Sequence, residues 1–221
     1  MYLDNSLLLM GSISNGVLTP ATLTTATGTY YSANVYDTAP ATVNTPNQPV
    51  DLGMGETLEI SLAFPTGPTT AAETVNNTPG TLEIQLISDS SAASFGSTTP
   101  QILCSTGAIF VPGTWQGTYS YTVGSTVISG GLIYVCIAAS TNNTPASSPT
   151  YWQLAGTAAL QTGTLTYLHV DHASPHLLQR YIGLKYIVGG ISLAGGTIVA
   201  AIVKSTQDIQ NIFYGSGFKV L

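Results

Sequence analysis

The sequence has very little charge. Only 6% of its 221 residues are Asp, Glu, Lys or Arg, against roughly 25% in an ordinary soluble domain. The first basic residue is Arg180, and the formal net charge is −6. Nucleic-acid binding through phosphate neutralisation needs a basic patch, so we expect no nucleic-acid partner. A surface made of Ser, Thr, Asn, Gln and Tyr instead suits packing against other proteins.

Cysteine is also scarce. Cys104 and Cys136 are too few for a disulfide framework, and whether they pair is left open by the sequence. Free cysteine is most often a small buried hydrophobic group, which is the role expected for each. The apolar run at residues 7–10 is too short for a signal-peptide core and has no basic residue ahead of it, so no export is expected.

One apolar stretch, residues 186–203, is about long enough to cross a bilayer. It contains paired glycines at 189–190 and 195–196, beside Ile, Val and Thr residues. These features favour turns around two buried strands over a membrane helix. We therefore expect no membrane partner.

No segment shows a sustained 3.6-residue apolar period, whereas several alternate apolar and polar residues as half-buried strands do. The predicted inward-facing sets are Leu58, Ile60, Leu62 and Phe64; Leu82, Ile84 and Leu86; and Ile182, Leu184, Tyr186 and Val188. Residues 197–203 are predicted to form a strand buried on both faces. The fold class expected is an all-β sandwich.

The segments between these strands are rich in turn-forming residues. Residues 65–68, 72–80 and 90–100 are predicted to be turns and loops. Segment 19–50 is dominated by Thr, Ala, Asn and Pro, which favours either a long arm or irregular edge strands. A neighbouring subunit is a reasonable place for such an arm to dock.

Residues 114–156 stand apart from the rest of the chain. They contain both tryptophans and a group of tyrosines: Trp115, Trp152, Tyr119, Tyr121, Tyr134 and Tyr151. They also contain a hairpin signal, in which Gly130-Gly131 separates two apolar runs at 126–129 and 132–137. We predict a small inserted β module built on clustered aromatic rings.

The histidines are the candidates for metal binding. His169, Asp171, His172 and His176 lie close together, and imidazole with carboxylate can bind Zn²⁺. There is no H-E-x-x-H motif. If residues 164–170 form a strand, His169 shares a face with Leu165 and Tyr167. We favour an ordinary polar loop over a metal site and expect no cofactor.

No pattern indicates an enzyme. The sequence has no G-x-S-x-G elbow, no P-loop and no G-x-G-x-x-G motif. Carboxylate pairs such as Glu56 with Glu59, or Glu59 with Glu83, could be imagined as glycosidase acids. Alternation explains them better as outward-facing, solvated strand residues.

Four segments carry a family resemblance: MYLDNSLLL at the start, VDLGMGETLEISLAF at 50–64, TLEIQLISDS at 81–90 and RYIGLKYIVGG at 180–190. In this order they resemble the capsid cement (decoration) proteins of podovirus-like phages, typified by the Bordetella-phage cement family. The resemblance implies a jelly-roll domain, here 1–113 with 157–221, made in the host cytoplasm and bound to the outer capsid surface of the virion. It further implies a homo-oligomer, a dimer or trimer, that clamps neighbouring subunits of the major capsid protein.

The four basic residues are candidates for capsid contact. Arg180, Lys185, Lys204 and Lys219 could gather on one face of the sandwich and meet acidic capsid subunits. Arg180 is favoured for bidentate pairing with a carboxylate. The alternative is that these charges are scattered and solvated.

The inserted module carries a second resemblance. Trp115, TYSYTVGSTVISGGLIYVCI and SPTYWQLAG resemble the small aromatic β modules of chitin-binding type in chitinases and phage fibres. This likeness implies an alternative function, a carbohydrate-binding adhesin displayed on the virion. The glycan-stacking candidates are Tyr119, Tyr121, Tyr151, Trp115 and Trp152, of which the two tryptophans are favoured for the module core.

Overall fold

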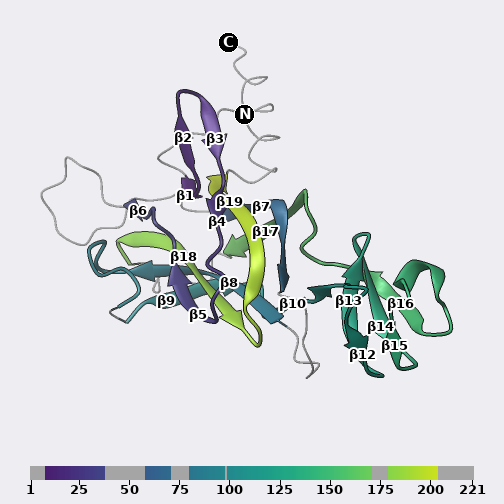
Figure 1. The fold of residues 1–221 in the computed structure, drawn as a ribbon. Coiled ribbons are helices and arrows are strands. Elements are labelled where there is room, and N and C mark those ends of the chain that lie inside the picture. The colour runs from purple at the N-terminus through teal and green to yellow at the C-terminus, as the bar shows by residue number, and fades with distance from the viewer. Residues whose placement is uncertain (1–7, 38–57, 71–79, 98, 171–178, 204–221) are drawn as a thin grey trace, which may run out of the picture.

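The structure, a computed structural model, describes residues 8–37, 58–70, 80–97, 99–170 and 179–203. Within these ranges the chain consists of β-strands, loops and one short 3₁₀ turn, η2 (Pro145–Ser147). The all-β fold predicted from the alternating sequence is confirmed. Two sheets face each other as a sandwich, and a smaller β module lies to one side of them (Figure 1).

The first sheet is antiparallel in its sandwich part. Its strand order is β1 (Leu8–Met10) with β4 (Ala21–Thr22), then β19 (Leu193–Val203), β7 (Leu58–Thr70) and β17 (Thr164–Val170). Strands β1 and β4 pair with successive parts of β19, so together they form one interrupted edge of this sheet.

The second sheet is also antiparallel. Its order is β9 (Gln101–Ser105) with β10 (Ile109–Val111), then β8 (Gly80–Asp89), β18 (Tyr181–Gly189), and β5 (Gly28–Tyr31) with β6 (Tyr36–Asp37). Both of its edges are therefore made of two short strands placed end to end.

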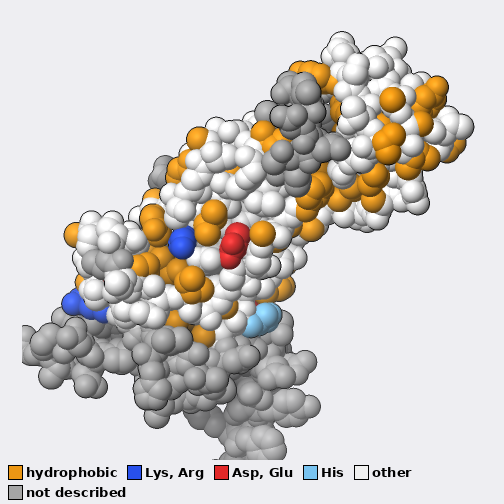
Figure 2. Space-filling view, turned by 90° about the horizontal axis from the view of Figure 1, so that it is seen from below, with side chains coloured by type: hydrophobic (Ala, Val, Ile, Leu, Met, Phe, Trp, Pro, Cys, Tyr) orange, Lys and Arg blue, Asp and Glu red, His pale blue; other side chains and the backbone are white. Residues whose placement is uncertain are grey.

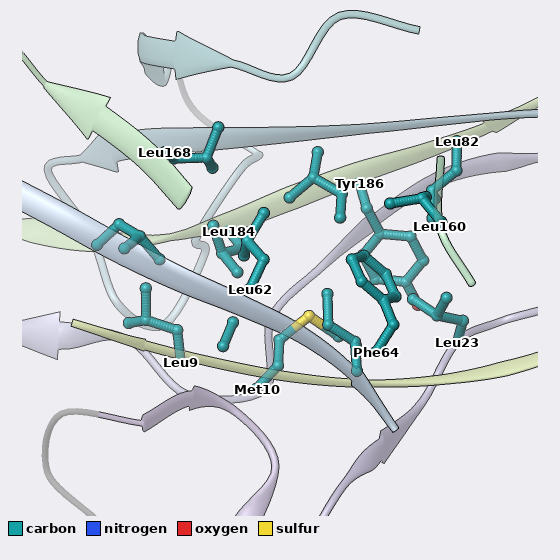
Figure 3. Close-up of a cluster of buried hydrophobic side chains, with 14 of the residues drawn as sticks. Leu9, Met10, Leu23, Leu62, Phe64, Leu82, Leu160, Leu168, Leu184 and Tyr186 are labelled. Carbon is teal, nitrogen blue, oxygen red and sulfur yellow. The ribbon is translucent and has the colours of Figure 1, made fainter. Parts of the chain in front are cut away.

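The main core lies between the sheets and uses the alternating residues. Nine of the predicted inward-facing side chains are buried by at least 98%: Ile60, Leu62, Phe64, Leu82, Ile84, Leu86, Ile182, Leu184 and Val188. Figure 3 shows Leu62 and Phe64 packed among Leu184, Tyr186 and Leu9. Burial of each large apolar side chain stabilises the fold by about 1.5–3 kcal/mol, so this cluster is the principal stabilising feature of the sandwich.

The described part of segment 19–50 forms edge strands on its own chain. Strands β5 and β6 extend the second sheet beside β18, and the backbone N–H of Ser32 donates to the carbonyl of Leu184 at 2.8 Å. For residues 21–37 the edge-strand interpretation is thus correct, and docking of this part on a neighbouring subunit stays a prediction. Residues 38–50 lie outside the described residues.

Strand β7 runs straight through residues 65–68, where a turn was predicted. That prediction is wrong, because threonine hydroxyls accept hydrogen bonds from the two backbone N–H groups between Pro65 and Pro68, so the extended chain leaves neither unsatisfied. Thr197 Oγ1 accepts a hydrogen bond from the N–H of Thr66, and Thr162 Oγ1 accepts one from Gly67, each at 3.0 Å. The register against β19 shifts repeatedly in this region.

The paired glycines of the apolar stretch differ in their roles. Strand β18 ends at Gly189 and Gly190 has a φ of +71°, so the turn predicted there is confirmed. Gly195 and Gly196 instead lie inside β19, and the turn predicted there is wrong. Gly196 has a φ of +137° and packs so closely on β7 that a Cβ would lie 2.9 Å from Pro68 Cα. None of the described residues forms a helix long and apolar enough to cross a membrane.

Glu59 and Glu83 were both expected to be solvated, but both are at least partly buried. Glu59 is only 6% exposed, because β7 is a central strand and places it between His169 of β17 and Val203 of β19. The prediction that Glu59 is solvated is wrong. Glu83 is half-buried, and hydrogen bonds from Gln85 Nε2 and Ser105 Oγ, each 2.7 Å, hold the pKa of its carboxyl below the usual value.

A hairpin that the sequence analysis missed interrupts the edge of the first sheet. It comprises β2 (Ser12–Ser14) and β3 (Val17–Thr19), joined by Asn15 and Gly16 with φ of +50° and +77°. Positive φ at both central residues is the geometry that Asn-Gly favours in two-residue hairpin turns, so the dipeptide was the available signal. Figure 1 shows this hairpin projecting from the sandwich.

Both described cysteines are free thiols. Cys136 is fully buried, as expected, whereas Cys104 is half-buried. They belong to different hydrophobic clusters, so they do not pair. Burial raises the pKa of the Cys104 thiol to about 11, which leaves almost no thiolate at neutral pH.

Candidate functional site

The inserted segment forms a compact β module joined to the first sheet. Its strands are β11 (Gly113–Thr114), β12 (Ser120–Tyr121), β13 (Thr126–Ser129), β14 (Leu132–Cys136), β15 (Ser140–Thr141) and β16 (Trp152–Thr157). Strand β11 runs parallel to β13 and also pairs with β7, through Gly113 opposite Thr70. The order β13-β14-β16 therefore continues the first sheet, while β12 and β15 form a separate two-stranded ribbon.

The predicted hairpin is confirmed. Strands β13 and β14 pair from Thr126 with Val135 to Ser129 with Leu132. Gly130 and Gly131 form the two-residue loop with φ of +59° and +79°. Because both angles are positive, the Gly-Gly pair provides the turn type that matches the twist of the two strands.

The module has a hydrophobic cluster of its own. Its buried members are Tyr121, Val127, Tyr134, Cys136 and Trp152, and the partly buried rings of Trp115, Tyr119 and Tyr151 pack against them. None of the buried residues of the main sandwich core comes from 114–156. The module is thus stabilised mainly by its own aromatic rings.

Two of the five glycan-stacking candidates are buried and cannot receive a sugar. Tyr121 is 4% exposed and Trp152 is 2% exposed, and their rings meet edge to face at a centroid distance of 5.1 Å. The Trp152 indole N–H donates to the carbonyl of Asn143 at 2.8 Å, and the Tyr121 hydroxyl accepts from the N–H of Gln116 at 2.7 Å. The core role favoured for Trp152 agrees with this, whereas stacking by Tyr121 is wrong.

Trp115, Tyr119 and Tyr151 keep part of their surface exposed. The indole nitrogen of Trp115 is buried and has no hydrogen-bond partner among the described residues. The sequence of the module contains no Asp, Glu, Lys, Arg or His. Recognition by the module would therefore use ring faces, hydroxyls and amides, which suit a neutral ligand.

The Arg180 guanidinium is already paired within its own chain. It donates to both carboxylate oxygens of Asp37, with Nε to Oδ1 at 2.9 Å and Nη2 to Oδ2 at 2.8 Å, and it lies over the ring of Tyr181. The hydrogen bonds from Arg180 to Asp37 raise the pKa of the guanidinium further. In the isolated chain the Nε and Nη2 groups of Arg180 therefore face Asp37, and pairing of Arg180 with a capsid carboxylate stays a prediction.

Of the other three basic candidates for capsid contact, only Lys185 lies among the described residues. Lys185 lies in β18 between Gln85 of β8 and Tyr31 of β5, near the carboxylate of Glu83. Lys204 and Lys219 lie outside the described residues, so their gathering with Arg180 on one face stays a prediction. Arg180 and Lys185 are both compensated by acidic neighbours.

The charged residues of the described chain are concentrated on the second sheet. Asp37, Glu83, Asp89, Arg180 and Lys185 belong to it or to its end, and Glu59 is the exception on the first sheet. Asp89 is fully buried, and its Oδ2 accepts a hydrogen bond from the N–H of Gly96 at 2.7 Å, which closes the loop after β8. Figure 2 shows isolated charged side chains on one face of the molecule, among polar and apolar ones.

The histidine cluster is only partly described. Residues 164–170 form β17, and His169 shares its exposed face with Leu165 and Tyr167, as predicted. Asp171, His172 and His176 lie outside the described residues. Among the described residues, no three His, Cys, Asp or Glu side chains are grouped so that they could hold a metal ion.

A cavity of about 300 Å³ lies at the junction of the module with the sandwich. Residues from β7, the β13-β14 turn and the segment after β16 line it, including Pro68, Gly131 and Leu160. The residues that line it are glycine, proline, alanine, leucine, isoleucine, threonine and glutamine, with no charged side chain among them.

No protein-family model matches the sequence, and no curated protein matches it. The resemblance to cement proteins therefore rests on the motifs of the chain itself.

Proposed function

We propose that the chain is a non-enzymatic decoration protein that binds the outer surface of a tailed-phage capsid and stabilises contacts between major capsid protein subunits. The observation that carries this proposal is the pairing of the strands. With β1 and β4, β5 and β6, and β9 and β10 each counted as one interrupted strand, the sandwich has eight strands along the chain. The first four pair with the last four in reverse order: β1 and β4 with β19, β5 and β6 with β18, β7 with β17, and β8 with β9 and β10. A long antiparallel hairpin rolled into two four-stranded sheets gives this order, which supports a jelly roll.

A fold alone does not define a function, so the surface must support the proposal as well. The described surface is neutral and polar, and its exposed cation Arg180 is paired with Asp37. Burial of such a surface against another protein costs little desolvation free energy, because few charges have to be stripped of water. This composition supports a protein partner, and the resemblance of the chain names the major capsid protein.

The position of the module suggests how the sandwich is oriented. The module leaves the sandwich at the end where β7 stops and β8 starts, and Gly80 there packs against Thr70 and the carbonyl of Val111. Strands β7, β18 and β19 run from this end to the opposite one, at Leu58, Tyr181 and Val203. We place the capsid contact at that opposite end, with the module directed outwards.

The projecting β2-β3 hairpin is the strongest contact candidate in that region. Val17 is 64% exposed and Leu18 is 43% exposed, although both are large apolar residues. Isolated two-stranded ribbons are marginally stable in water, so a ribbon this short gains most from a partner surface. Exposed apolar side chains grouped on a projection are also typical of interaction sites.

Replacement of Val17 by Asp is therefore expected to weaken capsid binding at least tenfold, because it places a charge in the proposed apolar contact. The matched control is Val123→Asp, since Val123 in the module is also 64% exposed. Purified chain is mixed with capsids of the phage that encodes it, and co-sedimentation with the particles gives the dissociation constant. Equal affinity of the two variants would overturn the hairpin contact, and failure of the unmodified chain to sediment with capsids would overturn the proposed function.

The second candidate function is a carbohydrate-binding adhesin acting through the module. It is favoured by the half-exposed rings of Trp115, Tyr119 and Tyr151 on an uncharged surface. Deletion of 114–156 is expected to leave capsid binding unchanged, because none of the buried residues of the sandwich core comes from this segment. Binding to immobilised chitin, measured for the full chain and for the deletion variant, tests the adhesin function. If the full chain binds chitin and the deletion variant does not, the adhesin is supported. If neither binds chitin, only the decoration function is supported.

A further inference from the structure

The turn of the β2-β3 hairpin exposes an asparagine that is followed by glycine. The sequence Asn-Gly occurs once in the chain, as Asn15-Gly16. Both residues are exposed, and their φ angles are +50° and +77°. A Cβ built on Gly16 would meet no atom within 4 Å, so the space around this peptide group is open to water.

An Asn-Gly pair can lose the side-chain amide without an enzyme. The glycine backbone nitrogen, once it has lost its proton, forms a bond to the asparagine Cγ. The C–N bond of the side-chain amide then breaks, and the leaving group takes up a proton and departs as ammonia. Water opens the resulting succinimide ring at either carbonyl, which gives aspartate or isoaspartate. Glycine favours ring closure because it has no Cβ to hinder the close approach of its backbone.

The hairpin leaves the reacting nitrogen available. In a two-residue loop the turn hydrogen bond joins the flanking residues, here Ser14 and Val17, so the N–H of Gly16 lies outside the ladder. Ring closure also requires the Asn15 backbone to rotate out of the turn. Each strand of this ribbon has only three residues, and so short a ribbon is marginally stable in water, which permits that rotation in the free chain.

We propose that Asn15 is a modification site, at which spontaneous deamidation with water as co-reactant switches off the capsid contact of the β2-β3 hairpin. Aspartate at this position places a carboxylate beside the exposed apolar side chains of Val17 and Leu18, and this charge must lose its water in the contact. Isoaspartate adds a methylene group to the backbone, so the loop no longer sets Ser14 opposite Val17. This inference rests on the proposed function, which places the hairpin against the capsid.

Binding to the capsid is expected to protect Asn15. The contact holds the ribbon closed and so prevents the backbone rotation that ring closure needs. Free chains therefore lose their capsid affinity with time, whereas chains already on a particle keep Asn15 intact. Equal rates of conversion for free and capsid-bound chain would overturn this protection.

Incubation of the full chain at mildly alkaline pH tests the chemistry without any capsid. Conversion of Asn15 adds one negative charge to a chain of formal net charge −6, a shift that isoelectric focusing resolves. Mass spectrometry of proteolytic fragments locates the changed residue. The internal control is Asn142, which is also exposed and has a φ of +59° but is followed by Asn143. Asn15 is expected to convert first, and conversion of Asn142 ahead of it would overturn the proposal.

The variant Asn15→Gly tests the effect on capsid binding. It removes the side-chain amide and keeps residue types that form this turn, since Gly130 and Gly131 form a two-residue loop with φ of +59° and +79° in the same chain. The capsid affinity of the unmodified chain is expected to fall about tenfold as Asn15 converts, because the new carboxylate is unpaired in the contact. Over the same incubation Asn15→Gly is expected to keep the affinity with which it starts. Equal losses in both chains, or full conversion of Asn15 without loss of affinity, would overturn the switch.

Failure of this inference can be told apart from failure of the proposed function. Fresh chain that binds capsids and retains both Asn15 and its affinity throughout the incubation overturns the switch alone, and the decoration function stands. Fresh chain that does not bind capsids overturns the decoration function and the switch together, even where Asn15 converts.

Discussion

Replacement of Trp152 by Ala is expected to unfold the inserted module while the sandwich stays folded. Trp152 is 2% exposed, packs on Tyr121 and donates a hydrogen bond to the carbonyl of Asn143. Truncation of a buried aromatic side chain costs about 3–5 kcal/mol. A domain of this size has a total stability of only a few kcal/mol, at about 0.05–0.15 kcal/mol per residue. The loss is therefore comparable with the whole stability of the module.

Amide hydrogen exchange read separately in the two parts of the chain measures this effect. Protection is expected to be lost in β13 and β14 and retained in β8 and β18. Leu154→Ala is the control, because Leu154 lies on the same strand as Trp152 but is 56% exposed. Loss of protection in β18 together with β14 would show that module and sandwich unfold as one unit, contrary to the two separate clusters.

Replacement of Leu184 by Ala is expected to have the converse effect, destabilising the sandwich by about 2–5 kcal/mol. Leu184 lies in the middle of β18, is fully buried and pairs with Leu86 of β8. Its backbone also holds the edge segment, because its N–H donates to Ser32 Oγ at 2.9 Å. Removal of the side chain leaves a cavity between two sheets that cannot collapse freely, which places the cost towards the upper part of the range.

The midpoint of urea unfolding, followed by circular dichroism, gives the change in free energy of unfolding. Ile102→Ala serves as the control on the same sheet, and its cost is expected to be below about 1 kcal/mol because Ile102 is already 49% exposed. A Leu184→Ala variant that unfolds at the midpoint of the unmodified protein would contradict the placement of this residue in the main core.

The regular strands and the Gly-Gly hairpin could be predicted because each is encoded locally. In β8 and β18 the apolar residues recur at every second position, and period-two alternation is itself the signal of a half-buried strand. Gly130 and Gly131 adopt the positive φ angles of the turn, which glycine allows without steric cost, so the residue types themselves indicate the turn. The same logic applied to Asn15 and Gly16 would have found the β2-β3 hairpin.

The failures share a different cause, which is contact with residues distant in sequence. The prolines of β7 read as a turn because the hydroxyls that satisfy neighbouring backbone groups come from distant segments, Thr197 from β19 and Thr162 from the turn before β17. Glu59 reads as solvated because its burial depends on β17 and β19 on either side. Alternation assigns a face to a residue, but it does not say whether that face is covered.

The residue types that make up the candidate site could be predicted from the sequence, whereas their arrangement in space could be predicted only in part. The clustering of aromatic residues located the module, yet it could not separate the buried ring of Tyr121 from the half-exposed rings of Tyr119 and Tyr151. The basic character of Arg180 was plain, but its partner Asp37 is distant in sequence and is brought to it by pairing of β6 with β18. Side-chain identity is local, whereas availability for a ligand is a tertiary property.

A reconstruction of the phage particle at side-chain resolution tests the central claim most directly. The account predicts density for the sandwich on the outer capsid surface, with the β2-β3 hairpin against the major capsid protein and the 114–156 module directed away from the shell. Particles that contain the chain only in the tail or its fibres, with no density for it on the shell, would contradict the decoration function.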